Sequence, residues 1–131
     1  TTVLILDKND TSCAMIEHLL NMSGFKAHAC LRASITGVCS VDEDLNTEVL
    51  VVDYWLIDET AIEFCSRLIR FDLKIPLVVI LSDDDNEAIK RECESVGAVF
   101  LSKSKLYSLP VILSSRIPAG VAKPLGLSFN G

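Results

Sequence analysis

Four polar side chains stand at or just after the ends of short apolar runs in this sequence. They are Asp7, Asp53, Ser82 and Lys103. The run that ends in Asp53, EVLVVD, is the most informative, because its four consecutive apolar residues predict a strand buried on both faces, where an unpaired carboxylate is costly to bury. Asp53 is therefore either the first polar residue of an ordinary loop or part of a site in which carboxylate, hydroxyl and ammonium groups bind a ligand.

The elements that would position these residues alternate along the chain. Short apolar runs predict strands, and segments with apolar residues at helical spacing predict helices. The predicted strands are 3–6, 25–30, 48–53, 77–81 and 98–102, and the predicted helices are 12–24, 61–71, 86–96 and a short one from about 108. Residues 33–45 predict a poor helix. The apolar side of the helix 61–71 is expected to carry Ile62, Phe64 or Cys65, Leu68 and Ile69, with packing mainly through Ile62, Cys65, Leu68 and Ile69.

This alternation predicts an α/β fold with a parallel sheet covered on both faces. The carboxyl ends of parallel strands lie at one edge of the sheet, and ligands bind beyond that edge. If the strands are neighbours, the four polar side chains named above converge there. A polar residue at the end of one strand would carry little meaning, but four placed by the same rule predict a ligand site.

Composition limits the classes of function. The 131-residue chain has the length of one domain, and half of its residues are apolar. Its net charge of −6 and the absence of a Lys/Arg cluster argue against a nucleic-acid-binding surface. No apolar run is long enough to span a bilayer and no signal-peptide pattern opens the sequence, so we expect a cytoplasmic segment without membrane contact. The five cysteines lack CxxC spacing, which favours reduced thiols over a zinc site.

Over residues 3–117 the chain resembles the receiver domain of two-component response regulators and hybrid histidine kinases. The segments that carry the resemblance are VLILDKND, EVLVVDYWLID, LVVILS and GAVFLSKS, in the family's order and with suitable spacing. The resemblance implies a flavodoxin-like (βα)5 fold, a doubly wound parallel sheet with strand order 2-1-3-4-5, for a domain of residues 1–117. Residues 118–131, with two prolines and three glycines, are expected to form a tail or linker.

The same resemblance implies a role for each polar residue of the rim. Asp53 would be the phosphoacceptor, and together with Asp7 it would hold Mg²⁺. Ser82 and Lys103 would bind the phosphoryl group, and Phe100 would be the switch residue. A carboxylate is a competent phosphoryl acceptor, but the anionic oxygens crowded against it require a divalent cation and a lysine. The implied partners are a histidine kinase or phosphotransfer domain and other domains of the parent protein.

The features of this chain that bear most directly on the site, compared with the family's pattern, are Lys8, Asp83 and Trp55. Lys8 replaces the second acid of the acidic pair, which in the family is a direct metal ligand. The exchange of a negative for a positive charge predicts weak or lost Mg²⁺ binding, with the Lys8 ammonium able to pair with Asp53 in the cation's place. Asp83 adds a carboxylate near the expected phosphoryl position, and Trp55 is bulky; both are expected to modify the site.

The sequence leaves two functions open. In the first, the chain is a receiver-type signalling domain of a phosphorelay that accepts a phosphoryl group on Asp53 with altered metal dependence. In the second, it is a pseudo-receiver in which Lys8 and Asp53 form a fixed ion pair and the domain acts only through protein–protein contacts. A hydrolase with Asp53 as nucleophile is disfavoured because no paired acid stands two residues on. The missing initiator methionine and the lack of a DNA-binding pattern near the end favour a segment of a larger protein such as a hybrid sensor kinase.

Overall fold

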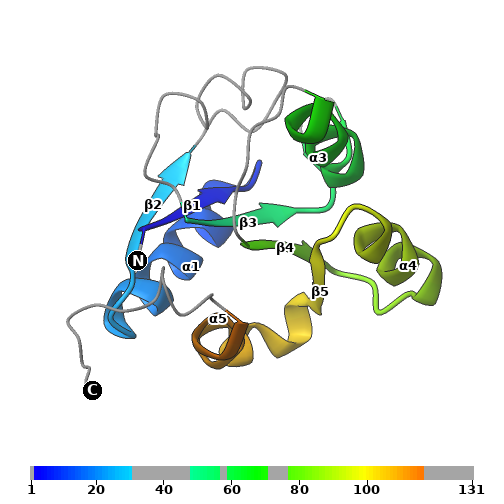
Figure 1. The fold of residues 1–131 in the computed structure, drawn as a ribbon. Coiled ribbons are helices and arrows are strands. Elements are labelled where there is room, and N and C mark those ends of the chain that lie inside the picture. Colours follow the sequence, from blue (N-terminus) through cyan, green and yellow to red (C-terminus); the bar gives the residue numbers. More distant parts are fainter. Residues whose placement is uncertain (1, 31–47, 57–58, 71–76, 117–131) are drawn as a thin grey trace.

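The computed structural model describes residues 2–30, 48–56, 59–70 and 77–116. At its centre is one parallel sheet of five strands in the order β2-β1-β3-β4-β5, with helices on both faces (Figure 1). The strands are β1 (Thr2–Leu6), β2 (Lys26–Cys30), β3 (Val49–Asp53), β4 (Leu77–Ser82) and β5 (Val99–Ser102). The helices are α1 (Asp10–Met22), α3 (Ala61–Arg70), α4 (Glu87–Ser95), the 3-10 helix η1 (Lys103–Ser108) and α5 (Leu109–Arg116).

The predicted α/β fold and its strand order are thereby confirmed. The helix expected within residues 33–45 and the tail expected at 118–131 lie outside the described residues. None of the helices in the described ranges is long and apolar enough to cross a membrane.

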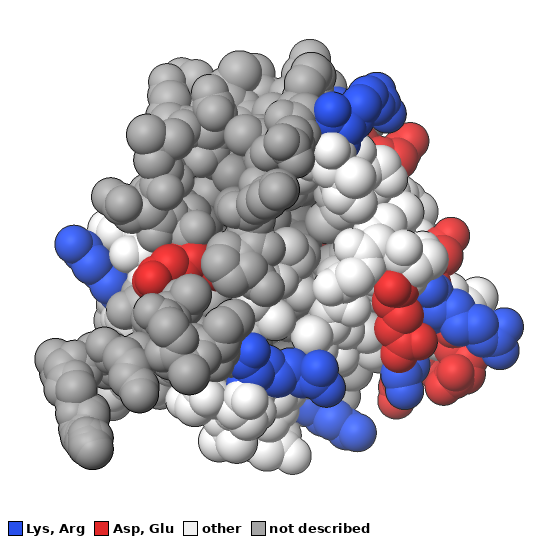
Figure 2. Space-filling view, viewed as in Figure 1, with Lys and Arg blue, Asp and Glu red and all other residues white. Residues whose placement is uncertain are grey.

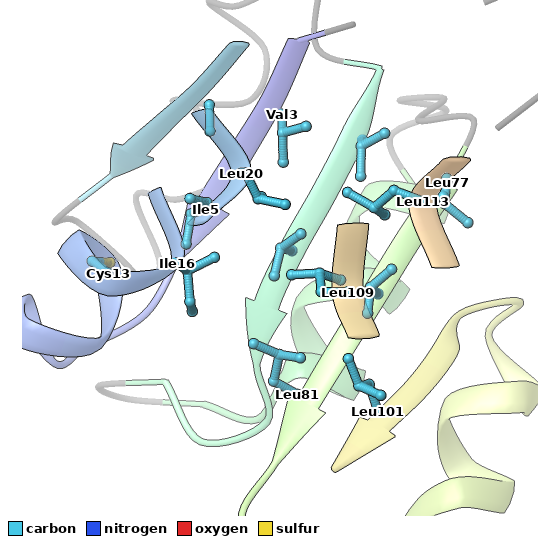
Figure 3. Packing of buried hydrophobic residues seen from close by; sticks show 14 residues of the cluster. Val3, Ile5, Cys13, Ile16, Leu20, Leu77, Leu81, Leu101, Leu109 and Leu113 are labelled. Atoms are coloured by element: carbon cyan, nitrogen blue, oxygen red, sulfur yellow. The ribbon is translucent and has the colours of Figure 1, made fainter. Parts of the chain in front are cut away.

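Two separate apolar clusters cover the faces of the sheet, because successive residues of a strand point to opposite sides. In β3, Val49 belongs to the cluster that includes residues of α1 and α5, whereas its neighbour Leu50 belongs to the cluster that includes residues of α3 and α4. Figure 3 shows the first cluster, where Leu20 of α1 and Leu109 of α5 lie over the central strands. Burial on both faces explains why the central strands read as continuous apolar runs in the sequence.

The buried side of α3 differs from the expected one at Ile69. The residues that α3 buries are Ala61, Phe64, Cys65 and Leu68, and Ile62 is partly buried. Ile69 is 63% exposed, so its assignment to the core was wrong. The reason is helical geometry: Ile69 lies about a quarter turn around the helix from the centre of the face that the four buried residues define.

Helix caps fix the loops at the carboxyl edge of the sheet. The side chain of Asn9 accepts a hydrogen bond from the backbone N–H of Ser12 at the start of α1, and Asn86 caps α4 in the same way. Only three residues, Asp7 to Asn9, lie between the end of β1 and the start of α1. Gly97 follows α4 with a φ of 79°, a backbone conformation that residues other than glycine rarely adopt.

Candidate functional site

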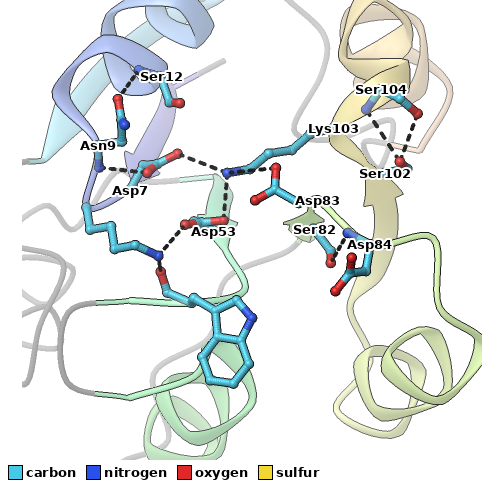
Figure 4. Close-up of polar contacts among 12 residues, drawn as sticks. Asp7, Asn9, Ser12, Asp53, Ser82, Asp83, Asp84, Ser102, Lys103 and Ser104 are labelled. Carbon is cyan, nitrogen blue, oxygen red and sulfur yellow. Dashed lines mark hydrogen bonds and ion pairs between the residues drawn. The ribbon is translucent and has the colours of Figure 1, made fainter.

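The parallel register brings four strand ends to one edge of the sheet. Asp7 follows β1, Asp53 ends β3, Ser82 ends β4, and Lys103 follows β5. Neighbouring strands are paired close to these ends, with Asp53 opposite Leu81. Figure 4 shows that the side chains of Asp7, Asp53 and Lys103 point toward one another across this edge.

Lys103 is the charge that joins the carboxylates. Its Nζ lies 2.9 Å from Asp53 Oδ1, 3.9 Å from Asp7 Oδ2 and 4.0 Å from Asp83 Oδ1. Burial alone lowers the pKa of Lys103, but the hydrogen bond to Asp53 and the nearby carboxylate charges outweigh burial, so that the pKa is raised above its ordinary value. Lys103 is therefore charged, and its ammonium contacts the carboxylate of Asp53, a residue that is only 5% exposed.

Asp7 is more deeply buried than Asp53 and less well satisfied. It is 1% exposed, and its Oδ1 accepts a hydrogen bond of 2.9 Å from the backbone N–H of Asn9. Its other oxygen, Oδ2, is buried without a hydrogen-bond partner in the described part of the chain. Burial raises the pKa of the Asp7 carboxyl, although the Asn9 N–H favours the charged form.

Lys8 contacts the opposite oxygen of Asp53. Its Nζ lies 3.6 Å from Asp53 Oδ2 and donates a hydrogen bond of 2.8 Å to the backbone carbonyl oxygen of Trp55. The structure thus contains the ion pair that the sequence suggested between Lys8 and Asp53. The contact with the Trp55 carbonyl was not predicted, because every residue has a backbone carbonyl and no sequence signal marks this one.

The aromatic pair after Asp53 links the site to α4. The rings of Tyr54 and Trp55 meet edge to face, with centroids 5.1 Å apart and an interplanar angle of 86°. The Tyr54 hydroxyl donates a hydrogen bond of 2.8 Å to Glu92 Oε1 of α4. Burial, together with this hydrogen bond, raises the pKa of Tyr54 to about 12. Trp55 itself is largely exposed, so its indole does not close over the carboxylates; the Tyr54–Glu92 link was not foreseen.

The remaining predicted residues lie at the margin of this group. Ser82 is buried, and its Oγ accepts a hydrogen bond of 3.1 Å from the backbone N–H of Asp84. Asp83 is exposed to solvent and reaches the group only through Lys103. Phe100 is partly buried against the cluster beneath α3 and α4, with Ile80 opposite it on β4. Its role as a switch stays a prediction.

The residues as placed do not fit a divalent cation. The Oδ2 atom of Asp7 is available as a ligand, but both oxygens of Asp53 are in ion pairs with lysines. The described residues contain no group of three or more His, Cys, Asp or Glu side chains arranged to hold a metal ion. Mg²⁺ prefers several oxygen ligands in an octahedral arrangement, and here an ammonium group already contacts two of the available oxygens.

The chain resembles known proteins in its three-dimensional structure. No protein-family model and no curated protein sequence matches the chain. Solved structures do match: an orphan response regulator of H. pylori (23% identity, TM-score 0.71, 90% of this chain and 97% of that one) and the chemotaxis response regulator CheY4 of Vibrio cholerae (19% identity, TM-score 0.74, 90% and 98%). A response regulator receiver domain from Clostridium thermocellum matches with 19% identity and a TM-score of 0.77 over 89% and 94%. The chain therefore has the fold of a response regulator receiver domain.

Proposed function

We propose that this chain is a receiver-type signalling domain that accepts a phosphoryl group on Asp53. The observation that carries the proposal is the position of the Asp53 carboxylate, at the carboxyl edge of a receiver fold with Lys103 Nζ 2.9 Å away. In such a sheet the carboxyl edge is where ligands bind. The lysine supplies the positive charge that a phosphorylated carboxylate needs beside it.

The proposed reaction is transfer from a phosphohistidine of a histidine kinase or phosphotransfer domain. An oxygen of Asp53 attacks the phosphorus, the P–N bond breaks, and the histidine nitrogen leaves with the electron pair and takes up a proton. The product is an acyl phosphate on Asp53. Lys103 neutralises part of the added charge, and the buried hydroxyl of Ser82, held by the N–H of Asp84, can donate to a phosphoryl oxygen.

Surface charge supports a protein partner over a nucleic acid. The face in Figure 2 shows basic and acidic side chains mixed along α4, whose exposed residues include Lys90, Arg91, Glu92 and Glu94. The whole chain carries a net charge of −6, which would repel phosphate backbones. A histidine kinase, a phosphotransfer domain or another domain of a hybrid sensor kinase is the kind of partner that we propose.

The proposal is tested by labelling. The protein is incubated with a small phosphodonor such as acetyl phosphate, and intact mass or phosphate-affinity electrophoresis detects the addition of one phosphoryl group. We expect labelling of the wild type and none of Asp53→Asn, while Asp85→Asn, which removes an exposed carboxylate outside the site, should be labelled like the wild type. Absence of labelling in the wild type, with and without Mg²⁺, contradicts the proposal.

A second function is favoured by one specific contact. Because Lys8 and Lys103 engage both oxygens of Asp53, the carboxylate can serve as a fixed structural ion pair in a pseudo-receiver that only binds other proteins. In that case the wild type stays unlabelled, and Asp53→Asn lowers stability, since the half-buried Lys103 ammonium loses its nearest carboxylate and the exposed Lys8 loses an ion pair. The labelling result decides between the two functions.

A further inference from the structure

We infer that the Lys8 ammonium occupies the cation position of this site and excludes Mg²⁺, so that Asp53 is phosphorylated without a metal ion. The first half of this inference concerns binding and stands independently; the second half rests on the proposed function. Four features of the described residues support it: the oxygens that the ammonium contacts, the rigidity of the Trp55 carbonyl, the charge balance, and the Asp7 oxygen that has no hydrogen bond.

The ammonium of Lys8 contacts two oxygen atoms on one side, while its side chain stays 45% exposed to solvent. It lies 2.8 Å from the Trp55 carbonyl oxygen and 3.6 Å from Asp53 Oδ2. A lysine ammonium has donors and no acceptor, so it can donate a hydrogen bond to the Trp55 carbonyl and form an ion pair with Asp53 at the same time. One neutral and one anionic oxygen are also ligands that a hard divalent cation would choose, which means that Lys8 and Mg²⁺ compete for the same atoms.

The Trp55 carbonyl is held in place by its neighbours. The N–H of Tyr54 donates to Leu81 O at 2.8 Å, and the N–H of Leu56 donates to Glu59 O at 2.9 Å. Trp55 also forms an isolated antiparallel bridge with Thr60. Because the backbone is fixed on both sides of Trp55, its carbonyl is a preorganised acceptor for Lys8. On the other side, only Asp7 to Asn9 connect β1 to α1, which limits how far Lys8 can move.

Charge balance favours one ammonium over an added dication. The cluster contains three carboxylates, Asp7, Asp53 and Asp83, and two ammonium groups, Lys8 and Lys103. Two of the three negative charges are therefore already balanced. A dication placed on Asp53 Oδ2 with Lys8 in position would lie within a few Å of a positive charge, and repulsion at that distance is strong.

Lys8 does not donate a hydrogen bond to the buried Oδ2 atom of Asp7. No ion pair within 4.0 Å joins Lys8 to Asp7 in the described residues, and Asp7 Oδ2 has no hydrogen-bond partner. Removal of the Lys8 side chain would free the two oxygens that it contacts, Asp53 Oδ2 and the Trp55 carbonyl oxygen. Asp7 Oδ2 lies nearer to Lys103, at 3.9 Å from its Nζ. The Lys8 ammonium is therefore the group that keeps a metal ion away from Asp53 Oδ2 and the Trp55 carbonyl.

Magnesium titration tests the binding half. Trp55 is the only tryptophan and its carbonyl is a Lys8 partner, so its fluorescence reports on the site, with calorimetry as an independent measurement. We expect little response of the wild type to millimolar Mg²⁺. Lys8→Ala should bind at least about tenfold more tightly, and Lys8→Asp, which adds a carboxylate, more tightly still. Lys26→Ala is the matched control, because it removes an exposed lysine at the opposite edge of the sheet, beside Thr2, and should behave like the wild type.

Two results of this titration overturn the inference. One is wild-type Mg²⁺ binding as tight as that of Lys8→Asp. The other is a failure of both Lys8 variants, shown to be folded by circular dichroism, to bind Mg²⁺ better than the Lys26→Ala control.

Labelling with acetyl phosphate tests the second half. We expect the wild type to be labelled at a similar rate in EDTA and in Mg²⁺, whereas Lys8→Asp should be labelled only in Mg²⁺. A wild type that requires Mg²⁺ for labelling overturns the metal-independence of the reaction. If no variant is labelled under any condition, the proposed function fails and the second half of the inference with it, while the titration still decides whether Lys8 excludes the metal.

Discussion

The interior of the sheet and its carboxyl edge follow opposite rules. In the described part of the chain, the side chains of the two interior clusters are apolar, as for Phe64 of α3, which is fully buried. At the edge, the buried residues include two carboxylates, and one of them, Asp7, has an oxygen without a hydrogen-bond partner in the described residues. The difference teaches that the interior stabilises the fold, whereas the edge is maintained at the expense of stability, as expected of a functional site.

The largest expected effect is in the interior. Phe64→Ala should lower the free energy of unfolding by about 3–5 kcal/mol, because it removes a fully buried aromatic side chain and leaves a cavity. Ile69→Ala on the same helix is the matched control and should cost less than about 0.5 kcal/mol, since Ile69 is exposed. Denaturant titration of both variants measures the difference. Equal losses would mean that the faces of α3 are not divided as described.

At the carboxyl edge, replacement of a buried residue should raise the free energy of unfolding instead of lowering it. The pKa of Asp7 is raised in the folded protein mainly by burial, so the proton binds more tightly to the folded state than to the unfolded chain. The stability that comes with the protonated form is present below the unfolded pKa of 3.8 and is lost as the pH rises through the higher folded value. At neutral pH the ionised Asp7 is therefore a liability.

Asp7→Asn should accordingly raise the free energy of unfolding at neutral pH, by about 1–2 kcal/mol, and the gain should shrink in acid. The amide keeps an acceptor for the Asn9 N–H and adds a donor toward the neighbouring carboxylates. Urea titrations at neutral and acidic pH give the two values, with Asp85→Asn as the control for loss of a surface charge. A destabilised Asp7→Asn at neutral pH would remove the contrast between interior and edge.

The smallest effect concerns the link between the two regions. Tyr54→Phe removes the hydrogen bond to Glu92 and should cost about 0.5–1.5 kcal/mol. Tyr107→Phe, at a tyrosine that is 77% exposed, should cost nothing measurable. Because the chain has two tyrosines, the Tyr107→Phe variant also isolates Tyr54, whose ultraviolet titration should give a pKa of about 12. A value near 10 would show that the Tyr54 hydroxyl is not held as described.

The sequence was sufficient to predict the central strands, because a strand buried on both faces reads as a continuous apolar run. Continuous apolar runs such as the one before Asp53 predicted the central strands, and the family resemblance predicted their order. The error at Ile69 has a simple cause: an apolar residue near the end of a helix looks the same in sequence whether it faces the core or solvent. Side-chain identity alone did not distinguish Ile69 from Phe64.

The edge was predictable only as far as side chains determine it. Asp7, Asp53 and Lys103 could be placed together because each follows a strand of one parallel sheet. The Trp55 carbonyl could not, since backbone groups carry no sequence signature, and its position depends on turn hydrogen bonds between residues brought together by the fold. The Tyr54–Glu92 pair joins residues 38 apart in sequence, and nothing in either residue type indicates the other.

The strand order has a consequence for how the protein can be synthesised and fold. β2 pairs with β1, β3 then adds to the free side of β1, and β4 and β5 each add to the free side of the strand before them. No strand has to be inserted between two that are already paired, so the sheet can grow outward from one edge in the order in which the ribosome releases the chain. Asp7 and Asp53 would be placed before Lys103 emerges, and the two carboxylates would await their principal counter-charge until the last strand is added.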